Sequence, residues 1–162
     1  MEIIKYPNPK LREISKPVKL PLLAEDRQTL DEMYAYIKDL ANGAVGLSAI
    51  QVGIPKRMCV IRHTMPSGKI ANYKLVNPRI IRRSSKIEAY PEGCLSVAEE
   101  HNEPIIRSEQ VMVMAYDAIQ NKNIVVEATG LLSRVFQHEI DNKDGKLYND
   151  YIKEAKERLT ND

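Results

Sequence analysis

The chain has 162 residues, of which 43% are hydrophobic and 28% are charged, so it is long enough to bury a core as one domain. Its 24 basic and 22 acidic residues leave a formal charge of +2, which gives no reason to expect a specific nucleic acid or an anionic membrane as a partner. The apolar runs are too short to span a bilayer, and the opening residues lack the layout of a signal peptide. We therefore expect a single cytoplasmic domain, residues 1–162.

The first half of the chain is expected to hold one helix followed by strands. Apolar residues recur at three- and four-residue spacing from Leu30 to Ala41, and Asn42-Gly43 is a typical helix stop. Residues 43–53 are rich in small side chains and are typical of a loop. Apolar and β-branched runs then predict strands at residues 58–61, 73–76, 80–81 and 87–90.

The second half predicts a hairpin and two more helices. Residues 111–116 and 124–127 have the pattern of paired strands. After Thr129, Leu131 shares one helix face with Val135, His138 and Asn142, and a second apolar stripe lies beside it, so this helix should be mostly buried. Residues 152–159 are predicted to form a charged final helix. The fold class is therefore α+β: a central buried helix surrounded by short, mainly antiparallel strands, with an N-terminal and a C-terminal helix.

The strongest chemical signal lies on the predicted central helix, at His138-Glu139-Ile140-Asp141-Asn142. Side chains at i and i+4 point the same way and can bind one metal ion, and a glutamate beside the first ligand can accept a proton from water. The fifth residue is asparagine, so the H-E-x-x-H pattern is incomplete. From these five residues alone, a hydrogen-bonded core histidine beside a surface glutamate is the favoured interpretation.

Two further segments carry candidate groups. Cys94 lies in Glu92-Gly93-Cys94-Leu95-Ser96, where a thiolate would be a good soft ligand, although most free cysteines are small buried hydrophobes. Cys59 lies inside an apolar run and is interpreted as core. Gln51 ends the segment 46–51, whose small residues allow close approach of a substrate and whose amide could stabilise an oxyanion. Alone, the pattern of this segment favours an ordinary loop.

Taken together and in order, the three segments resemble the signature motifs of the peptide deformylase family: G-x-G-L-A-A-x-Q, E-G-C-L-S and Q-H-E-x-D-H. The chain has Gly46-Leu47-Ser48-Ala49-Ile50-Gln51, Glu92-Gly93-Cys94-Leu95-Ser96 and Gln137-His138-Glu139-Ile140-Asp141-Asn142. The resemblance extends outward to residues 7–11, 77–78 and 147–152, and the chain length also fits. Ala44 and Ser48 are small replacements in the first motif, whereas Asn142 replaces a histidine of the third.

The resemblance implies a role for each matching residue. In the family one divalent ion, Fe(II) often replaced by zinc or nickel, is bound by the motif cysteine and both histidines, so Cys94, His138 and the Asn142 position are the expected metal ligands. Glu139 is the expected general base and acid, and Gln51 with the backbone N–H of Leu95 would polarise the formyl carbonyl. Gly46, Val45 and Ile50 are expected to contact the substrate, and residues 136–140 are further candidates for the methionine pocket.

Asn142 is the consequential departure, because an amide oxygen is a weaker donor than an imidazole nitrogen toward borderline metals. Three arrangements stay open: an Asn142 oxygen that binds the ion directly or through water, an ion held weakly by Cys94 and His138 alone, or no metal. His101, seven residues after Cys94, is a less favoured replacement ligand and is more typical of a polar surface loop.

The favoured function is hydrolysis of the N-formyl group from the initiator methionine of nascent chains, weakened by Asn142. The alternatives are a protein that binds peptide N-termini without turnover, and a metal-free structural protein. The expected partners are N-formylmethionyl peptides. Transient ribosome contact through Lys153, Lys156 and Arg158 would suit this activity, although such residues usually form a solvated helix face.

Overall fold

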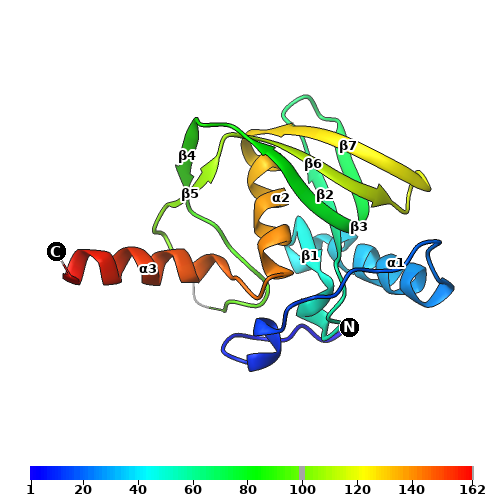
Figure 1. The fold of residues 1–162 in the computed structure, drawn as a ribbon, viewed down its shortest axis with the longest axis horizontal. Coiled ribbons are helices and arrows are strands. Elements are labelled where there is room, and N and C mark those ends of the chain that lie inside the picture. Colours follow the sequence, from blue (N-terminus) through cyan, green and yellow to red (C-terminus); the bar gives the residue numbers. More distant parts are fainter. Residues whose placement is uncertain (99–100, 162) are drawn as a thin grey trace.

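The structure is a computed structural model that describes residues 1–98 and 101–161. It contains α-helices, short 3₁₀ helices and β-strands, and it confirms the predicted α+β class (Figure 1). The helices are α1 (Ala24–Lys38), α2 (Gly130–Asn142), α3 (Tyr148–Asn161), η1 (Pro9–Arg12), η2 (Leu40–Asn42) and η3 (Ala49–Val52). The strands are β1 (Gly46–Ser48), β2 (Met58–Thr64), β3 (Ile70–Arg83), β4 (Ile87–Tyr90), β5 (Ile105–Ser108), β6 (Gln110–Asp117) and β7 (Lys122–Thr129).

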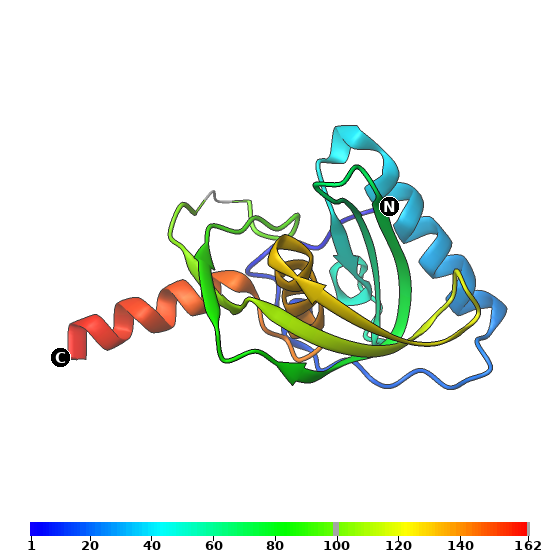
Figure 2. The ribbon, with the colours of Figure 1, turned by 90° about the horizontal axis from the view of Figure 1, so that it is seen from above.

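The strands form two antiparallel sheets. A five-stranded sheet has the order β1-β2-β3-β6-β7, and β4 pairs with β5 in a separate two-stranded ribbon. The larger sheet is curved, with α2 inside the curve and α1 on its outer side (Figure 2). The helix α3 projects from the body at the opposite end from α1. This arrangement places α2 between the sheet and the β4–β5 ribbon.

The position of strand β2 between two clusters of core residues explains why residues 58–61 are all apolar. Met58 and Val60 pack in the cluster that contains α1, whereas Cys59 and Ile61 pack in the cluster that contains α2. A strand covered on both faces needs apolar side chains at consecutive positions and not at alternate ones. Cys59 is only 1% exposed, so its interpretation as a core residue is confirmed.

Helix α2 is buried along most of its length, as its wide apolar arc predicted. Ten of its thirteen residues are buried. The stripe of Leu132, Phe136 and Ile140 packs against the sheet, while His138 and Glu139 lie on the side that faces the candidate site. Leu131 differs from the prediction, because it is 56% exposed and lines the mouth of that site.

The first helix ends earlier than its apolar pattern predicts. Asp39 has an extended backbone, and its side chain accepts a hydrogen bond from the backbone N–H of Ala41, which starts the separate turn η2. Gly43 then adopts a left-handed conformation with φ of 63°. Leu40, placed on the buried face by its spacing, is 83% exposed as a result.

Other boundaries also differ. The two strands predicted at residues 73–76 and 80–81 are parts of one strand, β3, which has register shifts after Val76 and after Ile80. The last helix begins at Tyr148, ahead of the expected residue 152. Neither β1 nor β5 was predicted. Within residues 1–98 and 101–161, no helix has both the length and the apolar character that crossing a membrane requires.

Candidate active site

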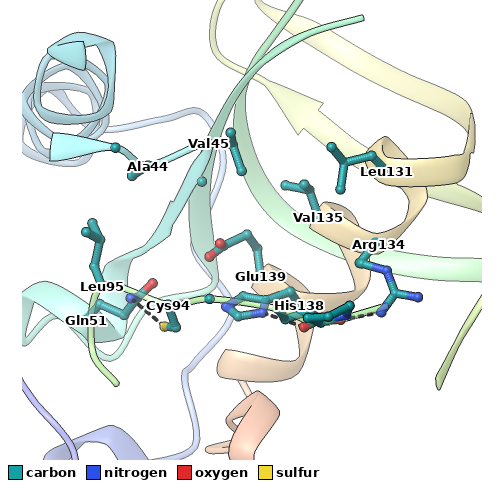
Figure 3. A pocket seen from close by; sticks show the side chains of 15 residues that line it. Ala44, Val45, Gln51, Cys94, Leu95, Leu131, Arg134, Val135, His138 and Glu139 are labelled. Atoms are coloured by element: carbon teal, nitrogen blue, oxygen red, sulfur yellow. Dashed lines mark hydrogen bonds and ion pairs between the residues drawn. The ribbon is translucent and has the colours of Figure 1, made fainter. Parts of the chain in front are cut away.

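A pocket of about 400 Å³ lies where β1, one side of α2 and the segment between β4 and β5 meet (Figure 3). Apolar and small groups form much of its wall, whereas polar groups gather at one side. Most of the candidate residues from all three motifs therefore share one pocket. The lining residues are Gly43, Ala44, Val45, Gly46, Gln51, Pro91, Glu92, Gly93, Cys94, Leu95, Leu131, Arg134, Val135, His138 and Glu139.

Cys94 and His138 lie side by side in this pocket. Both side chains line its polar side, next to Gln51 (Figure 3). Gln51 Nε2 donates to Cys94 Sγ over 3.5 Å and to Ser96 Oγ over 3.1 Å. Burial alone lowers the pKa of His138, but hydrogen bonds to Cys94 and Glu92 outweigh it and raise the pKa well above its ordinary value. A sulfur and an imidazole from distant segments thus converge, as the resemblance implied.

Glu92 orients the imidazole of His138 through a hydrogen bond to one of its ring nitrogens. Its Oε1 lies 2.9 Å from His138 Nδ1, so the other ring nitrogen is left for Cys94 or for a cation. Arg107 donates to both Glu92 oxygens, over 2.8 and 2.9 Å, and Arg134 donates to Oε2 over 2.7 Å. Burial raises the pKa of Glu92, but the hydrogen bonds and charges of Arg107 and His138 outweigh it and lower the pKa to about 2.

This buried charge network makes Arg107→Met a strongly destabilising change. Arg107 is only 5% exposed and also donates to Asp141 over 2.5 Å, so its loss leaves Glu92 buried with less compensation. We expect the free energy of unfolding at pH 7 to fall by about 3 kcal/mol, measured by urea unfolding. The exposed Arg82→Met is the matched control and should change stability by less than about 0.5 kcal/mol.

The pH dependence of this loss has a definite sign. A carboxyl with a lowered folded-state pKa stabilises the protein above its ordinary pKa of 4.5 and loses that contribution as the pH falls toward about 2. The deficit of Arg107→Met should therefore be largest at neutral pH and shrink between those two values. A deficit that stayed constant across this range would contradict the ion-pair explanation.

Glu139 is held between two residues of β1. Its Oε2 accepts a hydrogen bond of 2.5 Å from Ser48 Oγ, and its Oε1 lies against Gly46, where a Cβ atom would stand only 2.7 Å away. Burial raises the pKa of Glu139, against the opposing effects of the His138 charge and the Ser48 hydrogen bond. A carboxyl with a raised pKa is suited to exchange protons near neutral pH.

Gly46→Ala is expected to displace the Glu139 carboxylate without unfolding the protein. The new methyl group would meet the end of a flexible side chain, which can rotate away, and not backbone. Because misplacing a reacting group is costly, we expect kcat to fall at least tenfold with little change in the unfolding midpoint. Gly93→Ala is the control, since its Cβ would meet nothing within 4 Å although Gly93 lines the same pocket. Equal losses in both variants would argue against this account.

Asn142 is buried behind the pocket lining, with 1% exposure. Its Nδ2 donates to Ser48 Oγ over 3.2 Å and to Gln51 Oε1 over 3.4 Å. Its Oδ1 has no hydrogen-bond partner among the described residues, and an unpaired buried acceptor is costly unless a cation or water satisfies it. No group of three His, Cys, Asp or Glu that could hold a metal occurs among those residues. Cys94 and His138 are the two groups of this kind that lie side by side in the pocket, and Asn142 Oδ1 is an unpaired buried oxygen behind its lining.

The remaining predicted residues differ in whether they line the pocket. Val45 and Leu95 line the pocket, as expected. Ile50 is only 1% exposed. Neither Ile50 nor Phe136 lines this pocket, so neither side chain is placed to contact a substrate there. His101 does not line the pocket, and its ring packs edge-on against that of Tyr148, with 5.8 Å between the ring centroids. Glu92 and Ser48 were given no role from the sequence, although they lie in the same motifs as Cys94 and Gln51.

A thiol, an imidazole and a carboxyl gathered in one pocket define a candidate metallohydrolase centre. The sequence model described as "Polypeptide deformylase" matches residues 1–158 of this chain. The chain belongs to the polypeptide deformylase family, whose members are metal-dependent hydrolases that act on formylmethionyl nascent peptides. The resemblance found in the three motifs is confirmed.

Individual relatives agree with the family match. The chain is 35% identical to a peptide deformylase of Rhizobium meliloti over 154 residues, which cover 95% of this chain and 86% of the relative. It is 32% identical to a probable peptide deformylase of Synechococcus phage S-SSM7, with a TM-score of 0.81 and coverage of 93% and 99%. A class I type b enzyme from Acinetobacter baumannii, solved with Met-Ala-Ser bound, has a TM-score of 0.82 at 28% identity, with coverage of 93% and 97%.

Proposed function

We propose that this chain is a peptide deformylase that hydrolyses the formyl group of N-formylmethionyl peptides with the residues of the pocket described above. The observation that carries the proposal is that Gln51, Cys94, His138 and Glu139 converge on one pocket from three separate segments. A protein that retained the fold for structural reasons alone would not need a carboxyl with a raised pKa beside a histidine oriented by Glu92.

The cation would be held by Cys94 Sγ and by the His138 ring nitrogen that faces away from Glu92, with Asn142 Oδ1 as a weaker third donor. A soft thiolate beside an imidazole suits a borderline metal such as Fe(II), zinc or nickel. When bound, a divalent ion supplies Lewis acidity toward the formyl carbonyl and toward water. Because Cys94 and His138 are the two strong donors found there among the residues that the structure describes, we propose a weakly held ion.

The protein's own groups carry the proton transfers. Glu139 takes a proton from the attacking water and gives one to the departing amine as the formyl C–N bond breaks, so that formate and a free N-terminus are released. The Nε2–H of Gln51, which lies against Cys94, and the backbone N–H of Leu95 would stabilise the negative charge on the carbonyl oxygen.

The apolar part of the pocket would take the methionine side chain. Val45, Leu131 and Val135 form this wall, and they lie beside Glu139 in the close view (Figure 3). A relative with the same fold has been solved with Met-Ala-Ser, a peptide that begins with methionine. We propose that the protein acts in the cytoplasm, where nascent chains emerge, in transient contact with ribosomes through the basic residues of α3.

The test is formate release from formyl-Met-Ala by the purified protein, after reconstitution under reducing, oxygen-free conditions with Fe(II), nickel or zinc in turn. We expect turnover with at least one cation and its loss on adding a chelator. The cation content is measured in parallel by elemental analysis. Peptide binding without formate release under all three conditions would contradict the proposal and identify a binding protein.

A further inference from the structure

Two departures from the family motifs meet in space. Ser48 stands where the first motif has alanine, and Asn142 stands where the third has histidine. They are 94 residues apart in the chain, on β1 and at the end of α2, yet Asn142 Nδ2 lies 3.2 Å from Ser48 Oγ. Ser48 is 3% exposed and Asn142 is 1% exposed, so water cannot readily replace either partner. The two replacements therefore share one buried contact.

The hydrogen bonds around Ser48 fix the direction of its hydroxyl hydrogen. A hydroxyl has a single hydrogen to donate. Since Asn142 donates to Ser48 Oγ, the serine donates onward, and Glu139 Oε2 at 2.5 Å is closer than the backbone oxygen of Glu139 at 3.1 Å. Gln51 Oε1, at 3.4 Å, also accepts from Asn142 Nδ2, which sets the orientation of the amide.

The same contact determines where the Glu139 carboxylate stands. Gly46 leaves room for Oε1 on one side, and the Ser48 hydroxyl binds Oε2 on the other. An alanine at position 48 would have no hydroxyl to make this bond. A histidine at position 142 would lack the amide that donates at once to Ser48 and to Gln51. Each replacement thus gives the other its hydrogen-bond partner.

We propose that Ser48 and Asn142 act as a coupled pair, in which Asn142 orients the Ser48 hydroxyl and Ser48 positions the Glu139 carboxylate. The catalytic consequence rests on the proposed function, whereas the coupling itself does not. Ser48 is a positioning residue, because it touches Glu139 and not the reacting atoms.

A double-mutant cycle tests the coupling without requiring turnover. The unfolding midpoint in urea is measured for Ser48→Ala, Asn142→Ala and the double variant. We expect the double variant to lose clearly less stability than the sum of the two single losses. The control cycle pairs Asn142→Ala with Ser133→Ala, at a buried serine of α2 whose hydroxyl bonds Ser108 and Gln137 instead. This cycle should be additive. Additive stability losses in both cycles would contradict the proposed coupling between Ser48 and Asn142.

Kinetics and a structure test the positioning. At saturating cation, Ser48→Ala should lower kcat for formyl-Met-Ala about tenfold, with KM changed less than twofold. Ser48→Thr retains the hydroxyl and should have most of the kcat of the unaltered protein. Cation affinity should be the same in all three proteins, since Ser48 is not a ligand. A crystal structure of Ser48→Ala should show the Glu139 carboxylate moved. An unmoved carboxylate with unchanged kcat would refute positioning, whereas an unaltered protein that releases no formate refutes the proposed function alone.

Discussion

Glu139→Gln is expected to lower kcat for formyl-Met-Ala by at least about a hundredfold while the bound cation remains. A glutamine amide has nearly the same shape as the carboxyl and can still accept the Ser48 hydrogen bond, so the pocket should retain its form. It cannot, however, take a proton from water or pass one to the leaving amine. The loss should therefore fall on the chemical step and not on peptide binding.

The measurements are formate release at saturating peptide and the cation content by elemental analysis. Because Glu139 is buried with a raised pKa, removing its charge should leave the unfolding free energy unchanged or higher. Glu109→Gln, on a glutamate paired with the exposed Lys86, serves as the control and should behave like the unaltered protein. If Glu139→Gln lost the cation, the assignment of Glu139 as a proton carrier and not a ligand would be wrong.

The parts of the fold that were predicted are those with strong local patterns. The hairpin of β6 and β7, the buried strand β2 and the wide apolar arc of α2 all follow from side-chain periodicity. Strand β1 was missed because it has three residues, Gly46 to Ser48, and exists through its pairing with β2. Strand β5 was missed because Arg107 resembles a surface residue in the sequence, whereas in the structure it is buried and donates to Glu92 and Asp141.

In the candidate site, too, the residues in local motifs were predicted and those that depend on distant contacts were not. Cys94, His138, Glu139 and Gln51 were selected by the motifs that they occupy, and the structure gathers them in one pocket. What could not be predicted is the support around them, since the bonds of Glu92 to Arg107 and Arg134 cross 15 and 42 residues of chain. The bond of Ser48 to Glu139 crosses 91 residues. Contacts of this range depend on tertiary packing, which no local pattern encodes.

Asn142→His is expected to raise the affinity for zinc or nickel by at least about tenfold, because an imidazole nitrogen is a better donor than an amide oxygen for borderline cations. The change would complete a set of one cysteine and two histidines around the pocket. A chelator competition titration measures the affinity, and elemental analysis after dialysis measures retention. We expect turnover per protein molecule to rise with cation content.

Two controls separate a new ligand from the removal of an obstacle. Asn142→Ala removes the amide and supplies no donor, so cation affinity should not rise; an equal rise would mean that the asparagine blocks the site. In Asn142→His, one ring nitrogen must face the cation, which leaves the other to donate to Ser48 Oγ in place of the amide. Adding Ser48→Ala removes that acceptor, and this double variant has the motif residues of the family at both positions. If Asn142→His does not increase affinity in either background, position 142 does not face the cation, and Cys94 and His138 are its only protein ligands.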